Sequence, residues 1–290
     1  MNSTTDTFQD FPGWRWALPS GDSVFVAQQG AHVMSWHSGG QERLYLSPHA
    51  AFDGQTAIRG GVPVCFPQFN QRGPLTKHGF ARNVAWQIAP ELSSAHEKVF
   101  QLNSDDQSLS IWPFAFKVQL KVSLQTNAIH MALSVQNTGQ QALEFTGALH
   151  TYLSVSQITQ VSLLGQAQQA EWDTVTDRHQ RCSGHLQFES EFDRVYDVQT
   201  AVAEEMPDDL TPTWTLQDGV SSLQIAQSSS WGQSVVWNPG AAKCAQMADM
   251  PGSDYLNMLC VEAARVTSPI QVLPGQSWSG WQHLKHSPSC

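Results

Sequence analysis

The pattern of apolar and polar positions is that of a chain built from β-strands. From Phe114 to Leu124 the apolar residues stand at every second position, and the alternation returns from Ile129 to Val135 after a polar break at Asn127. Such a period buries one face of a strand, and a short polar break between two such segments predicts an antiparallel pair. Leu143 to Leu149 is expected to add a third strand.

Shorter runs of the same character recur along the chain, separated by turn residues. They are Val24 to Ala27, His32 to Trp36, Leu44 to Ser47, Leu223 to Ala226, Ser234 to Trp237 and Asn257 to Val261. No helical apolar stripe is sustained over three turns. Many short strands with turn signals predict an all-β fold, a sandwich or barrel of antiparallel sheets.

The chain is expected to form a single domain over residues 1–290. No repeat, low-complexity tract or Pro/Gly/Ser linker divides it, and β-rich folds of this length commonly form one domain. The polar segment Glu204 to Pro212 is expected to be a surface loop. Loosely ordered ends are expected at about residues 1–10 and 286–290.

Composition predicts a folded protein with a small ligand. Hydrophobic residues make up 41% of the chain, charged residues only 14%, and the net charge is −10. The 15 Lys and Arg residues form no runs, which disfavours nucleic acid and anionic membranes as partners. An anionic ligand would need a local cluster of positive groups. No apolar segment approaches the roughly 20 residues of a membrane span and Met1 begins no signal pattern, so a cytoplasmic location is expected. The protein is also expected to be a monomer.

The five cysteines favour neither disulfides nor a zinc knuckle. They are odd in number, widely separated and never in CxxC spacing: Cys65, Cys182, Cys244, Cys260 and Cys290. We therefore expect reduced, structural thiols.

Ile58 to Arg82 concentrates basic side chains among glycines and prolines. It contains Arg59, Lys77, His78 and Arg82, in a segment whose glycines allow close backbone approach to a ligand and whose prolines stiffen the loop. Arginine suits phosphate because its planar fork donates two charge-assisted hydrogen bonds. The alternative is that each arginine pairs with a surface carboxylate. Nucleotide-binding glycine patterns are missing, so side chains would hold any phosphate.

Three other segments carry candidate chemistry, each with an ordinary structural alternative. His150 ends an apolar run and could point into a cleft, or be a hydrogen-bonded core histidine. Glu262 follows an apolar run, where partial burial would raise its pKa toward that of a useful base, or it could face water. Asp193 lies among carboxylates that also fit a solvated turn. The 11 tryptophans include candidates for stacking on a sugar, although core packing accounts for most.

A metal site is not expected, because no HxH or HExxH spacing is present.

Six segments taken in order resemble the motif series of the hexose-6-phosphate mutarotases, or glucose-6-phosphate 1-epimerases, of the aldose 1-epimerase superfamily. They are IRGGVPVCFPQF, KHGFARNVAW, LHTYL, FDRVY, VVWNP and MLCVEAA, and the resemblance extends from about Trp36 to about Pro274. Several long motifs in the right order are more specific than any one of them.

The resemblance implies a galactose mutarotase-like β-sandwich with the sugar in an open cleft on one large sheet and no cofactor. It implies that His150 is the general acid and Glu262 the general base. Arg59, His78, Arg82 and Asp193 are then expected to line the sugar site. Lys77 stands where relatives often have an uncharged residue, so it could add to phosphate binding or be solvated.

Three other functions remain open on sequence alone. The nearest is a mutarotase of unphosphorylated aldoses. A non-catalytic carbohydrate-binding protein could use the same sheet, although it would not need both His150 and Glu262. A metal-dependent β-barrel isomerase is the third.

Overall fold

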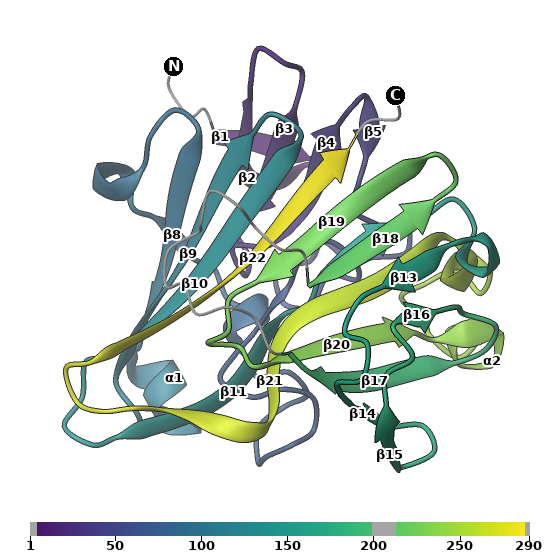
Figure 1. Ribbon diagram of the computed structural model, residues 1–290. Coiled ribbons are helices and arrows are strands. Elements are labelled where there is room, and N and C mark those ends of the chain that lie inside the picture. Colours follow the sequence, from purple (N-terminus) through teal and green to yellow (C-terminus); the bar gives the residue numbers. More distant parts are fainter. Residues whose placement is uncertain (1–4, 199–212, 288–290) are drawn as a thin grey trace.

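The computed structural model describes residues 5–198 and 213–287, and its regular secondary structure consists mainly of antiparallel strands (Figure 1). This confirms the all-β prediction. Within the described residues, the α-helices are two short segments, Asp106–Ile111 (α1) and Gly240–Cys244 (α2). The segment from Glu204 to Pro212, predicted as a surface loop, lies outside the described residues.

The first sheet has five strands and contains the amino-terminal part of the chain. Its order is β1 (Thr5–Phe8), β2 (Phe11–Ala17), β3 (Ser23–Ala27), β4 (Val33–Ser38) and β5 (Gln41–Glu42). Thr5–Phe8 pairs with β2, so the loosely ordered start expected through residue 10 is wrong for this segment.

The second sheet has nine strands and contains the two longest alternating segments of the sequence. Its order is β16 (His185–Leu186), β13 (Ser162–Leu164), β18 (Trp214–Asp218), β19 (Ser221–Gln227), β22 (Ser277–Ser287), β10 (Ala128–Asn137), β9 (Phe116–Gln125), β8 (Glu97–Asn103) and β7 (Gln87–Ile88). The predicted pairing of β9 with β10 is confirmed. Residues 286 and 287 belong to β22, which corrects the expectation of a loose segment there.

The third sheet has eight strands. Its path is β15 (Arg178–Arg181), β14 (Ala170–Asp173), β17 (Phe192–Asp197), β20 (Gln233–Asn238), β21 (Met258–Val272), β11 (Leu143–Leu149) and β6 (Val64–Cys65), and β12 (Tyr152–Ser154) also pairs with β21. Leu143–Leu149 is a strand as predicted, but it lies in this sheet and not beside β10. Leu44 and Leu46 make only isolated bridges, so the strand expected at 44–47 does not form.

One large hydrophobic cluster joins the sheets. It includes alternate residues of β9, such as Leu120 and Val122, together with Leu259 and Val261 of β21. Each large apolar side chain buried in this way contributes about 1.5–3 kcal/mol. The side chains on the opposite face of β21, such as that of Glu262, do not belong to this cluster.

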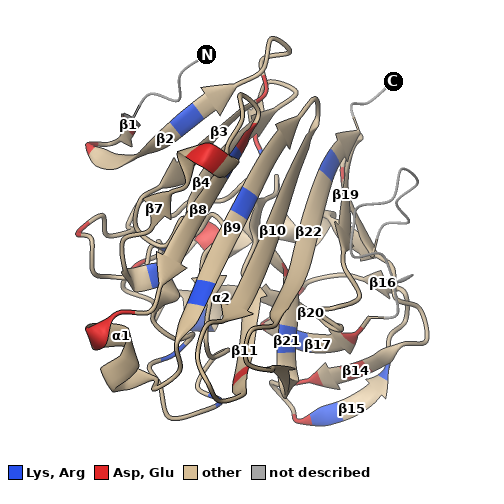
Figure 2. Cartoon of the chain, turned by 90° about the vertical axis from the view of Figure 1, so that its left-hand side faces the viewer, with Lys and Arg blue, Asp and Glu red and all other residues tan. Residues whose placement is uncertain are grey.

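The basic residues are dispersed over the visible face of the nine-stranded sheet. Figure 2 shows Lys and Arg separated from one another by uncharged residues along β9 and its neighbours. This face therefore has no continuous basic surface of the kind that binds nucleic acid. Among the described residues, no helix is long and apolar enough to cross a membrane.

Candidate active site

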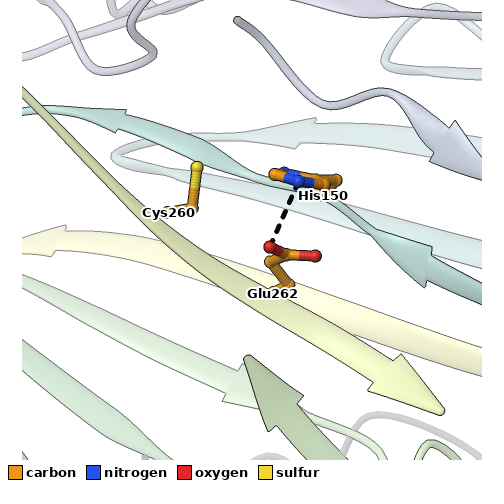
Figure 3. Close-up of side chains that lie close together, drawn as sticks. All are labelled: His150, Cys260 and Glu262. Atoms are coloured by element: carbon orange, nitrogen blue, oxygen red, sulfur yellow. Dashed lines mark ion pairs between the residues drawn. The ribbon is translucent and has the colours of Figure 1, made fainter. Parts of the chain in front are cut away.

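His150 and Glu262 face each other on the outer side of the eight-stranded sheet. Leu149 pairs with Ala263 across the antiparallel strands β11 and β21, so the next register position sets His150 opposite Glu262. His150 Nε2 lies 3.3 Å from Glu262 Oε1 (Figure 3). Glu262 is 1% exposed and His150 7% exposed, so the pair is buried.

A bulge in β21 fixes the face on which Glu262 lies. The register between β11 and β21 shifts between Phe145 and Gly147, where β21 contributes extra residues. Leu259, Val261 and Ala263 therefore enter the core on one side of the shift, while Ile270 enters it on the other. Without an extra residue the alternation would continue unchanged, and either Glu262 or Ile270 would be on the wrong face.

Burial drives both members of the pair toward their neutral forms. Desolvation raises the pKa of Glu262 well above its ordinary value, and the nearby charge of Asp193 raises it further. Desolvation lowers the pKa of His150 well below its ordinary value, and Arg82 and Arg59 add to this effect. Between the two shifted pKa values the pair therefore holds one exchangeable proton, with burial favouring Glu262 as its carrier.

Tyr152 and Trp237 surround the imidazole of His150. The Tyr152 ring stacks on it with ring centroids 4.8 Å apart and an angle of 11° between the planes. The Trp237 ring meets it edge-on at 6.2 Å and is itself only partly buried. Tyr152 lies two positions after His150, and residues two positions apart in an extended strand point to the same side. The sequence therefore contained a signal that Tyr152 lies beside His150. Trp237 lies in the motif VVWNP.

Arg59 is held by partners that the sequence did not reveal. Its Nη2 lies 3.0 Å from Asp249 Oδ2, and its Nη1 donates a 2.7 Å hydrogen bond to the Tyr152 hydroxyl. Gly60, next in the chain, has φ +112°, and a Cβ there would lie 2.4 Å from Tyr45 O. The glycine of the RGG motif thus permits the close backbone approach that sets Arg59 beside Tyr152.

His78 is a buried, neutral imidazole at the edge of the pair. Its ring meets that of His150 edge-on at 5.3 Å, and its backbone has φ +67°. Burial lowers its pKa far below the ordinary value, with neighbouring positive charges adding to the effect. The Asn70 N–H donates to Nδ1 over 3.2 Å, so the neutral ring carries its proton on Nε2.

Lys77 and Arg82 are basic groups without a carboxylate partner among the described residues. The Arg82 Nη2 donates to the Lys77 carbonyl over 3.0 Å, while its buried Nε has no hydrogen-bond partner in the described part of the chain. The pKa of Lys77 is lowered by partial burial and by the charges of Arg59, Lys243 and Arg82. The positive groups are therefore close enough to repel one another, as expected of a site prepared for an anion. Lys243, on α2, was not predicted.

Asp193 lies on the same outer face, two strands from β21. It pairs in register with Trp237, which in turn pairs with Cys260 beside Glu262. Burial raises the pKa of Asp193. The structure therefore brings all seven predicted residues to one region of the eight-stranded sheet. A cavity of about 670 Å³ on the outer face of the nine-stranded sheet contains none of them.

Solved structures share this architecture over nearly the whole chain. It superposes on the crystal structure of a "putative mutarotase" from Salmonella typhimurium with a TM-score of 0.84 and 26% identity, covering 98% of this chain and 92% of that one. A protein from Synechocystis, 21% identical, shares the fold with a TM-score of 0.79 over 99% of this chain and 98% of the other.

Sequence relatives assign the family. The family model described as aldose 1-epimerase matches residues 15–285, and the chain belongs to the aldose 1-epimerase family. A relative from Cenchrus ciliaris is 33% identical over 90% of this chain and 80% of its own length. One from Escherichia coli is 34% identical over 82% and 78%. Both carry the name "Putative glucose-6-phosphate 1-epimerase".

Proposed function

We propose that this protein is a mutarotase that interconverts the α and β anomers of a D-hexose 6-phosphate, with glucose 6-phosphate the preferred substrate. The observation that carries the proposal is the buried contact of 3.3 Å between His150 and Glu262. The family match and the names of the relatives support the reaction and the phosphorylated sugar.

The reaction needs two proton carriers that share one proton. With that proton on His150, Glu262 removes the proton from the C1 hydroxyl while His150 protonates the ring oxygen, and the C1–O5 bond breaks to give the aldehyde. Rotation about C1–C2 presents the other face of the carbonyl. The ring oxygen then attacks C1, Glu262 returns its proton to O1, and His150 recovers the proton from O5.

The burial of the pair suits this exchange of roles. Ring opening converts a charged pair, imidazolium and carboxylate, into a neutral pair, and reclosure does the reverse. Because burial favours the neutral pair in the free protein, the shared proton must pass to His150 before a closed sugar reacts. The direct contact between the two side chains provides that route.

The phosphate is assigned to the positive groups around Lys77. Lys77 and Arg82 have no carboxylate partner among the described side chains, whereas Arg59 is paired with Asp249 and Lys243 with Glu191. We therefore expect Lys77 and Arg82 to contribute most to phosphate binding. Arg59 lies beside them but also orients Tyr152 and, through the ring stack, His150.

The remaining residues are assigned to the sugar ring. The Nε2–H of His78 is proposed to donate a hydrogen bond near the ring oxygen, and Asp193 to accept one from a sugar hydroxyl or orient His150. Trp237, partly exposed beside the pair, offers a ring for the apolar face of the sugar. We also propose a cytoplasmic monomer, in keeping with four unpaired buried cysteines among the described residues.

NMR exchange spectroscopy of the anomers tests the function directly. Glucose 6-phosphate, galactose 6-phosphate and free glucose are each mixed with the purified protein, and the rate of α–β exchange is measured for each. We expect exchange to be fastest for a hexose 6-phosphate. Faster exchange of free glucose would instead identify an aldose mutarotase, and binding without exchange would identify a carbohydrate-binding protein.

A further inference from the structure

Cys260 completes a cluster of three potential metal ligands with the proposed catalytic pair. It lies two residues before Glu262 on β21, so both side chains project from the same face of the strand, and His150, the residue directly after β11, lies opposite them (Figure 3). One ligand atom from each of the three residues lies within 4.8 Å of the other two. We propose that His150, Cys260 and Glu262 form an inhibitory binding site for a thiophilic divalent cation, Zn²⁺ being the typical case.

The geometry is close to that of a zinc site. Bond lengths of about 2.0–2.3 Å place tetrahedral ligand atoms roughly 3.3–3.6 Å apart, and the His150–Glu262 contact is already 3.3 Å. The outer limit of 4.8 Å for the cluster requires a movement of only about 1 Å by a side chain to reach these separations. A fourth position would remain for water.

The mixture of donors selects the ion. A thiolate with an imidazole and a carboxylate suits Zn²⁺ and Cd²⁺, whereas Mg²⁺ and Ca²⁺ prefer oxygen ligands alone. A coordinated thiol loses its proton, so the thiolate and the carboxylate together balance the two charges of the ion. That balance matters because Cys260 and Glu262 are 0% and 1% exposed, and an unbalanced charge there would be costly.

Two polar atoms in the cluster lack partners. Glu262 Oε2 and His150 Nδ1 are buried without a hydrogen bond among the described residues. Buried polar atoms are normally satisfied, so a carboxylate oxygen without a partner beside a thiol and an imidazole is available to bind a ligand. A bound ion would satisfy the carboxylate.

The ion would occupy both proposed proton carriers. This consequence, unlike the metal site itself, rests on the proposed function. A sugar must place its O1 and O5 against Glu262 and His150, so ion and sugar phosphate cannot occupy the pair together. Zn²⁺ should therefore inhibit competitively with the sugar phosphate, and a chelator should restore activity.

Cobalt spectroscopy tests the site without relying on activity. Co²⁺, which takes tetrahedral zinc sites, is titrated into the purified protein, and the thiolate-to-cobalt charge-transfer band is followed and then displaced by Zn²⁺. The variants are Cys260→Ser and, as the matched control, Cys244→Ser, another buried thiol. All are compared in a Cys290→Ser background, because that thiol lies outside the described residues. Mg²⁺ is the control ion.

We expect one Co²⁺ per chain with a thiolate band in the parent and in Cys244→Ser, and an affinity at least tenfold weaker with no such band in Cys260→Ser. A band that survives in Cys260→Ser, or no band in the parent, would overturn the proposal. If Cys260→Ser fails to fold, Glu262→Gln provides the test. We expect this variant to bind Co²⁺ more weakly than the parent while retaining the thiolate band, and an unchanged affinity for Co²⁺ would contradict the site. Cobalt binding by a protein that fails to exchange anomers would refute only the function.

Discussion

Replacing Glu262 by Gln separates the chemistry of the carboxyl group from its role in folding. The change preserves size and shape at a position that is 1% exposed, while removing the ability to accept a proton. The backbone pairing of β21 with β20 and β11 is unaffected. The fold should therefore survive, and any loss of anomerisation would come from the missing base.

The expected loss of activity follows from the role of a single general base. Such a group contributes about a hundred- to ten-thousandfold in rate, which is about 2.7–5.4 kcal/mol of activation free energy. Because His150 and the binding groups remain, weak activity above the spontaneous reaction should persist. The rate of α–β exchange of glucose 6-phosphate, measured by NMR, gives this ratio directly.

The same substitution should stabilise the fold at neutral pH. Since burial raises the pKa of Glu262 in the folded state above its ordinary value of 4.5, the folded protein holds a proton that the unfolded chain releases. The wild-type free energy of unfolding therefore falls as pH rises from about 4.5 toward the folded pKa, by about 1.4 kcal/mol per pH unit. The Glu262→Gln variant has no such loss, so the two proteins should differ most above this window and least below it.

A second buried glutamate provides the matched control. Glu171 is 2% exposed but is paired with Arg194 at 2.8 Å, so Glu171→Gln should lower stability and leave anomer exchange near the wild-type rate. Urea unfolding between pH 4 and pH 8 measures both variants. Wild-type-like anomer exchange by a folded Glu262→Gln variant would refute the assignment of Glu262 as the base. An equal pH dependence of stability in this variant and the wild type would refute the raised pKa of Glu262 in the folded protein.

Three further predictions follow from the site. Lys77→Ala and Arg82→Ala should raise KM for glucose 6-phosphate at least tenfold while changing KM for free glucose little, and equal effects on both sugars in steady-state kinetics would disprove the phosphate role. Because burial lowers the pKa of His150 below 6.5, the acidic limb of kcat/KM should lie below pH 6.5. A midpoint at 6.5 would argue against the buried pair. Tyr152→Phe keeps the ring stack but loses one hydrogen bond from an arginine. The free energy of unfolding, measured with urea, should therefore fall by about 1–3 kcal/mol, and kcat should fall less than tenfold. A larger fall in kcat with unchanged stability would assign the hydroxyl a direct part in the reaction.

Local sequence was a reliable guide to strands whose one face is buried. The alternation around Leu120 and Leu133 predicted β9, β10 and their pairing, because a period of two leaves no other regular structure that buries all the apolar residues. It could not assign β11 to a sheet. That strand pairs with β21, more than a hundred residues later in the chain, and no local pattern specifies so distant a partner.

The motif series, read as an ordered whole, named His150 and Glu262, whereas each residue taken alone had an ordinary structural explanation. Sequence spacing also gave no sign of the ligand cluster with Cys260, because the imidazole belongs to the residue directly after a different strand. Asp249 likewise gave no signal. It reaches Arg59 only because the chain folds back on itself, and this contact changes which basic residues are free for a phosphate.

The sequence by itself therefore determined the strand content, the acidic and weakly charged surface, and the ordered motifs that identify the family. Tertiary structure decided which residues meet. The bulge in β21 turns Glu262 out of the core, cross-strand register sets His150 opposite it, and burial moves the pKa values of the two groups in opposite directions. These effects depend on long-range pairing and exclusion of water, which are properties of the assembled sheets and not of any short segment.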